Sequence, residues 1–187
     1  MTAPANHGLL APAMIKYTIE DDFDTDIDHY WELFFWDEAY NDGLYEALEI
    51  DRVVNEVTRE GEGEALVVRR KITMTPRRDI PAIFKKIVGG GVTYVEDNVF
   101  TRRTNTVQVK IIPGFAPDKF QSGGRYIVKE LGPRKVRRIF EGEVNCKIPL
   151  VGGKVEKHIV EEVKQSYRVT TDFTRRWLRD HPTQSAS

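Results

Sequence analysis

The sequence has almost no cysteine and no long apolar run, and each absence narrows what the chain can be. The single Cys146 cannot form a disulfide within the chain, which fits a reducing compartment, so we expect the cytoplasm. No apolar stretch approaches the roughly 18–20 residues that a membrane-spanning helix needs. The first residues, Met1 to Pro12, lack a basic start and contain prolines, so they do not resemble a signal peptide.

An excess of positive charge is also missing. The formal net charge of −1 and the absence of a recognised motif argue against a nucleic-acid partner. The charges are nevertheless segregated. Thirteen acidic residues and no Lys or Arg lie between Glu20 and Asp51, whereas seven basic residues and one acid lie between Arg69 and Lys86. We expect these two segments to attract each other; the alternative is a basic face that meets an anionic membrane or an acidic protein.

Residues that carry enzyme chemistry are sparse. Cys146 lies on the apolar parity of its strand, which indicates a buried thiol rather than a nucleophile. His158 and Glu162 are four residues apart on a predicted helix, but a metal site needs further ligands and none is evident. The glycine runs lack the Lys and Ser/Thr of a phosphate-binding loop. We therefore predict no catalytic residue, no metal ligand and no cofactor.

The chain does contain a strand pattern that leads directly into a long helical pattern. The last strand is ended by Pro149 and the Gly152-Gly153 pair. The residues after it recur in steps of three and four along one helical face. They are Val155, Ile159, Val163, Tyr167, Thr170, Phe173 and Trp177. This order predicts a sheet curled around a C-terminal helix, an architecture that encloses a cavity.

Alternation and turn residues predict the other elements. We expect strands at residues 14–20, 48–59, 65–74, 92–101, 104–112, 123–131 and 134–148. Thr25 is the expected N-cap of a first helix that runs to about Ala39 and is ended by Asn41-Asp42-Gly43. A short amphipathic helix is expected at Ile80–Val88, followed by three glycines.

Three stretches of the sequence resemble a known family. They are Ile80–Gly91, Lys147–Glu156 and Phe173–Leu178. They are similar to an uncharacterised bacterial domain family of the START-like, or polyketide-cyclase-like, superfamily. The resemblance implies an α+β helix-grip fold, with a curved antiparallel sheet of about seven strands around a long C-terminal helix and a hydrophobic cavity. It implies no catalytic residue, and Phe100 stands where the family usually has Trp.

The resemblance covers residues 14–180, which we expect to form one domain between tails at 1–13 and 181–187. Ligands of such a fold lie between the sheet and the long helix. Strand parity and the helical face then give the candidate ligand-binding residues: Tyr94, Glu96, Arg138, Ile159, Glu162, Val163, Tyr167 and Thr170. An ion pair between Arg138 and Glu96 is the alternative to recognition of a ligand head group.

The segment around Phe84 has two interpretations. It either caps one end of the sheet as a lid or opens as a gate that touches an anionic membrane, with Arg77 and Arg78 assisting. The residues expected to contact the membrane are Ile83, Phe84, Lys85, Lys86 and Ile87.

The preferred function is binding of a lipid, sterol or similar hydrophobic molecule for transfer or sequestration. The alternatives are a polyketide cyclase or aromatase that uses Tyr94, Glu96 or Arg138, and a protein-binding module whose cavity is filled by side chains.

Overall fold

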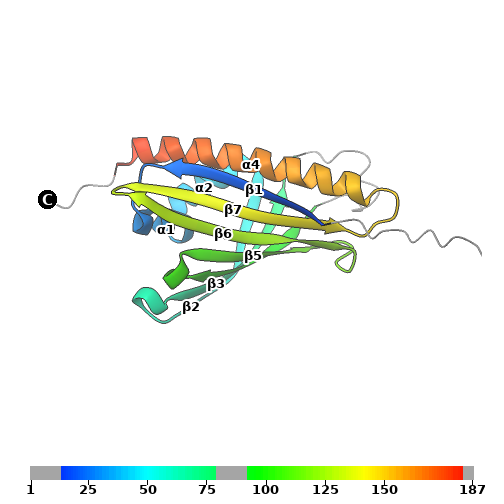
Figure 1. Ribbon diagram of the computed structural model, residues 1–187, viewed down its shortest axis with the longest axis horizontal. Helices are drawn as coiled ribbons and strands as arrows, with labels where there is room; N and C mark the ends of the chain where they lie inside the picture. The colour runs from blue at the N-terminus through cyan, green and yellow to red at the C-terminus, as the bar shows by residue number, and fades with distance from the viewer. Residues whose placement is uncertain (1–13, 79–91, 183–187) are drawn as a thin grey trace, which may run out of the picture.

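The fold is one curved antiparallel sheet with a long helix lying along it (Figure 1). The computed structural model describes residues 14–78 and 92–182. The strands are β1 (Ile15–Phe23), β2 (Ile50–Glu60), β3 (Val67–Pro76), β4 (Tyr94–Thr101), β5 (Thr106–Pro113), β6 (Phe120–Gly132) and β7 (Lys135–Cys146). Their order in the sheet is β1-β7-β6-β5-β4-β3-β2. The first strand thus pairs with the last, and β2 and β1 form the two edges.

Within the described residues, three α-helices accompany the sheet: α1 (Ile27–Phe35), α2 (Glu38–Leu48) and α4 (Gly152–Asp180). Figure 1 shows α4 along β1 and β7, with α1 and α2 near one end of the molecule. Short 3-10 turns lie at Gly63–Ala65 and Arg102–Thr104. The predicted α+β fold, with seven strands and a long C-terminal helix, is confirmed. The predicted helix Ile80–Val88 lies outside the described residues.

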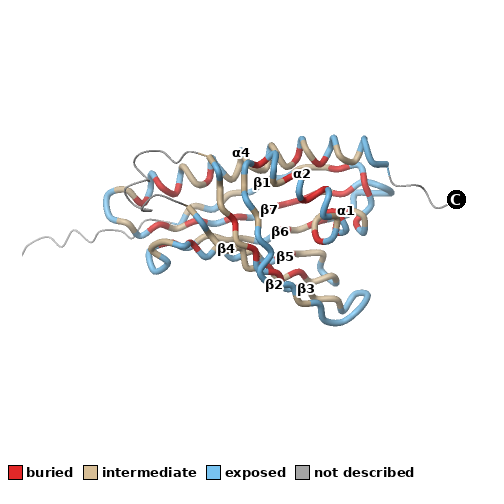
Figure 2. The backbone as a smooth tube through the Cα atoms, turned by 180° about the vertical axis from the view of Figure 1, so that it is seen from behind, coloured by how far each residue is buried: buried red, intermediate tan, exposed pale blue. Residues whose placement is uncertain are grey.

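Alternation along the strands gives the sheet one buried face. On β3, Val68, Arg70, Ile72 and Met74 are buried, whereas Arg69 between them is exposed. Buried residues also recur along β6 and β7, as the red stretches of the tube in Figure 2 show. Arg70 is thus a polar residue at a core position on the inner face of the sheet.

The junction between β7 and α4 is a close contact of two backbones. A Cβ on Gly152 would lie 2.2 Å from the carbonyl oxygen of Cys146, so only glycine fits there. One turn later, Oε1 of the buried Glu156 accepts a hydrogen bond of 2.7 Å from the Cys146 amide. The glycine and the glutamate together fix where α4 leaves the sheet.

The prediction that Asn41-Asp42-Gly43 ends the first helix was wrong. Helix α1 ends earlier, and a second helix begins after Asp37, whose carboxylate accepts from the Tyr40 amide at 2.9 Å. Asn41 is buried inside α2 and donates to the carbonyl oxygens of Leu33 and Asp37, at 2.9 and 2.8 Å. Hydrogen bonds within the fold therefore satisfy the Asn41 side chain, which the sequence analysis had interpreted as part of a turn.

Gly43, the other presumed breaker, lies where α2 meets α4. A Cβ at this position would be 2.8 Å from the Phe173 ring, so the glycine permits the close approach of the two helices. The expected N-cap Thr25 was also wrong by one residue. Asp26 caps α1 through the His29 amide at 2.8 Å, and the Thr25 hydroxyl contacts the His29 ring instead.

The two segments of opposite charge meet in the fold as expected, through Arg77 and Arg78, and the acidic segment also pairs with arginines outside the basic one. Carboxylates of the segment from Glu20 to Asp51 form ion pairs with arginines of later segments. These pairs include Arg52–Glu38 at 2.7 Å, Arg77–Glu46 at 2.8 Å, Arg78–Glu49 at 3.3 Å and Arg137–Asp22 at 2.7 Å. Arg77 and Arg78, which the gate hypothesis assigned to a membrane, thus have carboxylate partners within the protein.

Candidate ligand-binding site

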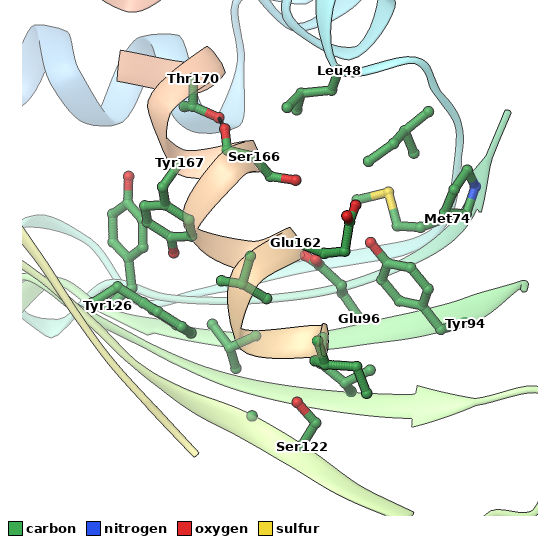
Figure 3. A pocket seen from close by; sticks show the side chains of 18 of the residues that line it. Leu48, Met74, Tyr94, Glu96, Ser122, Tyr126, Glu162, Ser166, Tyr167 and Thr170 are labelled. Carbon is green, nitrogen blue, oxygen red and sulfur yellow. Dashed lines mark hydrogen bonds between the residues drawn. The ribbon is translucent and has the colours of Figure 1, made fainter. Parts of the chain in front are cut away.

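A cavity of about 520 Å³ lies between the inner face of the sheet and the helices. Its wall draws on all three α-helices and on most of the strands. Figure 3 shows α4 crossing above the strands, with side chains of both pointing into the space between them. Because the sheet curves, the helix closes the middle of the concave face without filling it.

All eight residues proposed from the sequence as ligand-binding lie on the wall of this cavity. Tyr94 and Glu96 come from β4, Arg138 from β7, and the other five from α4. The residues predicted to contact a membrane, Ile83 to Ile87, lie outside the described part of the chain.

Much of the apolar wall was missed by the sequence reasoning. Helices α1 and α2 contribute Leu33, Phe34, Leu44 and Leu48, which form one side of the cavity. The sequence analysis took Asn41 to Gly43 as a helix end and therefore did not predict α2. Its apolar residues were for that reason not assigned to the cavity wall. A regular recurrence of Tyr40, Leu44 and Leu48 at steps of four was the available signal.

A polar cluster interrupts the apolar wall on β3 and β4. Arg70 pairs directly across the strands with Asn98, and Glu96 lies two residues before Asn98 on the same face. The Arg70 guanidinium lies over the rings of Phe34 and Phe35, 4.9 and 4.8 Å from their centres, and donates to the Phe34 carbonyl at 3.1 Å. From the sequence, Glu96 was proposed as a ligand-binding residue, but Arg70 and Asn98 were not.

The electrostatics of this cluster are set by burial. Burial raises the pKa of the Glu96 carboxyl, and the Asn98 amide and the Arg70 cation offset only part of that rise. Burial lowers the pKa of Arg70, although a guanidinium stays protonated in any such site. Burial also raises the pKa of Tyr45 to about 12, so that its hydroxyl remains a neutral donor.

Arg138 has a different partner from the one considered in the sequence. It is fully buried and forms an ion pair with Asp21 of β1, not with Glu96, and it also donates to the Thr171 hydroxyl of α4. Its guanidinium lies 4.7 Å from the centre of the Tyr167 ring. The strand register explains the choice, because Asp21 is directly opposite Arg138 in the β1–β7 pair.

Glu162 lies where the wall meets solvent. Its side chain is 53% exposed and is 3.7 Å from Arg78, which follows β3. Arg78 also donates to the Leu48 carbonyl at 3.0 Å, so it connects the end of α2 with α4. Figure 3 shows Glu162 on the helix across from Glu96 and Tyr94.

The described residues of the site offer proton donors and acceptors. No group of three or more potential metal-ligating side chains occurs in the described residues, so His158 and Glu162 have no third ligand there. Cys146 is buried in a cluster with Val155 and Val160, and burial raises the pKa of its thiol. Within residues 14–78 and 92–182, no helix is long and apolar enough to cross a membrane.

Comparisons with known proteins agree with this architecture. The family model described as "Protein of unknown function (DUF2505)" matches residues 18–178. No curated protein matches the chain.

Solved structures share the fold over almost their whole length. A protein from Thermus thermophilus is 13% identical with a TM-score of 0.61, covering 90% of this chain and 100% of that chain. The Zhui aromatase/cyclase from Streptomyces sp. R1128 is 12% identical with a TM-score of 0.56, covering 91% and 98%. A START superfamily protein from Mycobacterium smegmatis is 16% identical with a TM-score of 0.53, covering 88% and 98%. At these identities the likeness establishes the START-like helix-grip fold.

Proposed function

We propose that this chain, which belongs to the family described as "Protein of unknown function (DUF2505)", binds a hydrophobic small molecule in its cavity for transfer or sequestration. The observation that carries the proposal is the cavity of about 520 Å³ between the sheet and α4. Ligand pockets commonly measure about 300–1,000 Å³. Since an engineered cavity of roughly 150 Å³ accepts one benzene, this volume suits a ligand of about three to four rings or an acyl chain.

Burial of the ligand's apolar surface would supply most of the affinity. Each Å² removed from water contributes about 25 cal/mol. Leu33, Leu44 and Leu48 on one side and Val109 and Ile111 on the other offer such a surface. A protein-binding module would need no cavity of this size, so the third alternative from the sequence has no support of its own.

The proposal is tested by filling the cavity from α4. Val163 is half-buried and lines the wall, so the larger side chain of Val163→Trp would occupy ligand volume. We expect pyrene, followed by its fluorescence, to bind the wild type and to bind Val163→Trp at least about tenfold more weakly. Gln165→Trp, on the exposed face of the same helix, is the matched control and should bind normally. Equal affinity for all three proteins would place the ligand elsewhere.

Contact with an anionic membrane is also proposed, and only the sequence supports it. The sequence predicts that a helix containing Phe84, Lys85 and Lys86 would be apolar on one side and basic on the other. Phe84→Asp combined with Lys85→Glu should abolish co-sedimentation with vesicles that contain phosphatidylserine, and slow transfer of a fluorescent ligand between vesicles. Transfer at the wild-type rate would contradict the hypothesis that this segment acts as a membrane-contacting gate.

A second candidate function is acid–base catalysis on the bound molecule, as in a polyketide cyclase. The observation that favours it is Glu96, because burial raises its carboxyl pKa toward the range useful for proton transfer. Conversion of a poly-β-keto thioester, followed by absorbance, should then require Glu96. Loss of turnover in Glu96→Gln with pyrene binding retained would favour the enzyme over the carrier.

A further inference from the structure

The polar cluster in the wall is built on two neighbouring strands. Arg70 and Asn98 are cross-strand partners, and Glu96 precedes Asn98 by two residues, so the three side chains share the inner face. On the next strand their neighbours are apolar, because Asn98 is opposite Val109 and Glu96 is opposite Ile111. We call Arg70, Glu96 and Asn98 the polar subsite, a small polar island beside the apolar Val109 and Ile111 of β5.

The protein itself satisfies this island only in part. Arg70 has no carboxylate within 4 Å in the described chain, and its only hydrogen bond there goes to the Phe34 carbonyl. Glu96 accepts one long bond of 3.4 Å, from the Asn98 amide. Arg70 Nε and Asn98 Oδ1 are enclosed without any partner among the described residues. A buried polar group left unpaired is destabilising, so stability alone gives no reason for this set of residues.

Two further atoms of the subsite belong to residues that line the cavity. Arg70 Nη2 and Glu96 Oε1 have no partner in the described chain, yet neither belongs to its fully enclosed atoms. One is a donor and the other an acceptor. The Tyr94 hydroxyl lies on the same wall, and Figure 3 shows it beside Glu96.

We infer that the polar subsite recognises a neutral group that both donates and accepts a hydrogen bond, an alcohol or phenol hydroxyl, at one end of the apolar ligand. This inference rests on the proposed function and names its ligand class. The hydroxyl accepts from the Arg70 guanidinium and donates to the Glu96 carboxyl. The rest of the ligand lies against the apolar wall of β5 and the helices.

Charge decides between a hydroxyl and an ionised head group. A ligand carboxylate would lie beside Glu96, and a ligand ammonium would lie beside Arg70, so each meets a like charge in a poorly solvated site. The guanidinium and the carboxyl together carry little net charge. A neutral donor–acceptor group therefore fits both residues without adding an unpaired buried charge.

The test compares four probes that share one apolar body. Pyrene, 1-pyrenemethanol, 1-pyrenecarboxylate and 1-pyrenemethylamine are titrated into the full chain and followed by fluorescence. We expect the alcohol to bind about tenfold more tightly than pyrene, as one charge-assisted hydrogen bond permits, and both ionised probes to bind more weakly than the alcohol. A carboxylate or amine that binds as tightly as the alcohol overturns the inference.

Variants of the two charged residues should change the preference in opposite directions. Glu96→Gln leaves Arg70 as the only charge in the subsite, so the carboxylate should gain relative to the alcohol. Arg70→Met removes the positive charge, so it should abolish the rejection of the amine. If Arg70→Met does not fold, Arg70→Lys keeps the charge and should retain that rejection. Asp97→Asn and Arg69→Met change the neighbouring residues on the outer face of the same strands and should leave every preference unchanged.

The outcomes separate the inference from the function on which it rests. Binding of pyrene with no discrimination among head groups, or discrimination unaffected by Glu96→Gln, overturns the polar subsite and leaves the cavity as the binding site. Failure of all four probes to bind overturns the proposed function, and the subsite with it.

Discussion

Single residues at the start of α4 decide how closely the helix approaches the sheet. Gly152 is in contact with the Cys146 carbonyl, whereas Gly153 has open space at the Cβ position. Both residues belong to the same helix, so they differ in surroundings and not in secondary structure. This pair therefore distinguishes close packing from the general cost of glycine in a helix.

We predict that Gly152→Ala lowers stability and Gly153→Ala raises it. The added methyl at position 152 would lie 2.2 Å from a backbone oxygen, and such overpacking costs about 1–3 kcal/mol. At position 153 alanine should add about 0.5–1 kcal/mol, because glycine is the poorer helix former. Thermal unfolding of both variants measures the difference. Equal effects at the two positions would mean that the junction is looser than described.

Because Glu96 is buried, we predict that it makes the free energy of unfolding depend on pH. Burial raises its carboxyl pKa in the folded state above the unfolded value, so between the two values the folded state binds more protons. Stability attributable to Glu96 therefore falls as pH rises through this window, and stays low above the folded pKa. Glu96→Gln removes the cost, so its melting temperature should exceed that of the wild type by a few degrees at about pH 8 and by less at about pH 4. Asp97→Asn is the control. A Glu96→Gln advantage that does not change with pH would contradict the assignment.

At the scale of elements, Arg138 links β1, β7 and α4. Its guanidinium pairs with Asp21, bonds Thr171 and packs against the rings of Phe23 and Tyr167. Removing one partner of a buried ion pair leaves the other charge without compensation. The first strand and the last helix therefore depend on this one side chain.

We predict that Arg138→Met destabilises the protein by about 3 kcal/mol or more, measured by urea unfolding. Arg137→Met is the matched control, because the neighbouring Arg137 pairs with Asp22 at the surface, where ion pairs contribute little. Similar losses for both variants would show that burial of Arg138 does not set its importance.

Elements with a clear period could be predicted from the sequence, whereas elements set by tertiary contacts could not. The long helix and the seven strands follow from apolar recurrence, and the strand parity placed Glu96 and Arg138 on the inner face. Helix α2 was missed because Asn41 and Gly43 are usually turn residues, and only the neighbours Leu33 and Phe173 explain them here. The partner of Arg138 was missed for the same reason, since the β1–β7 register is not visible in local sequence.

At the scale of the whole molecule, the sheet and α4 enclose more space than their side chains fill. The cavity of about 520 Å³ has a largely apolar wall that includes the polar subsite, and a second arginine of the wall, Arg138, is already paired. A core left open at this size forgoes packing contacts that would stabilise the fold. The proposed binding of an apolar molecule would restore such contacts.

The most direct test of the account is native mass spectrometry of the gently purified protein, before and after incubation with a total lipid extract, followed by organic extraction. We expect one apolar molecule per chain, which carries a neutral hydroxyl and is released by the organic solvent. We expect Val163→Trp to bind much less of this molecule. A protein that holds no small molecule in either preparation would contradict the central claim.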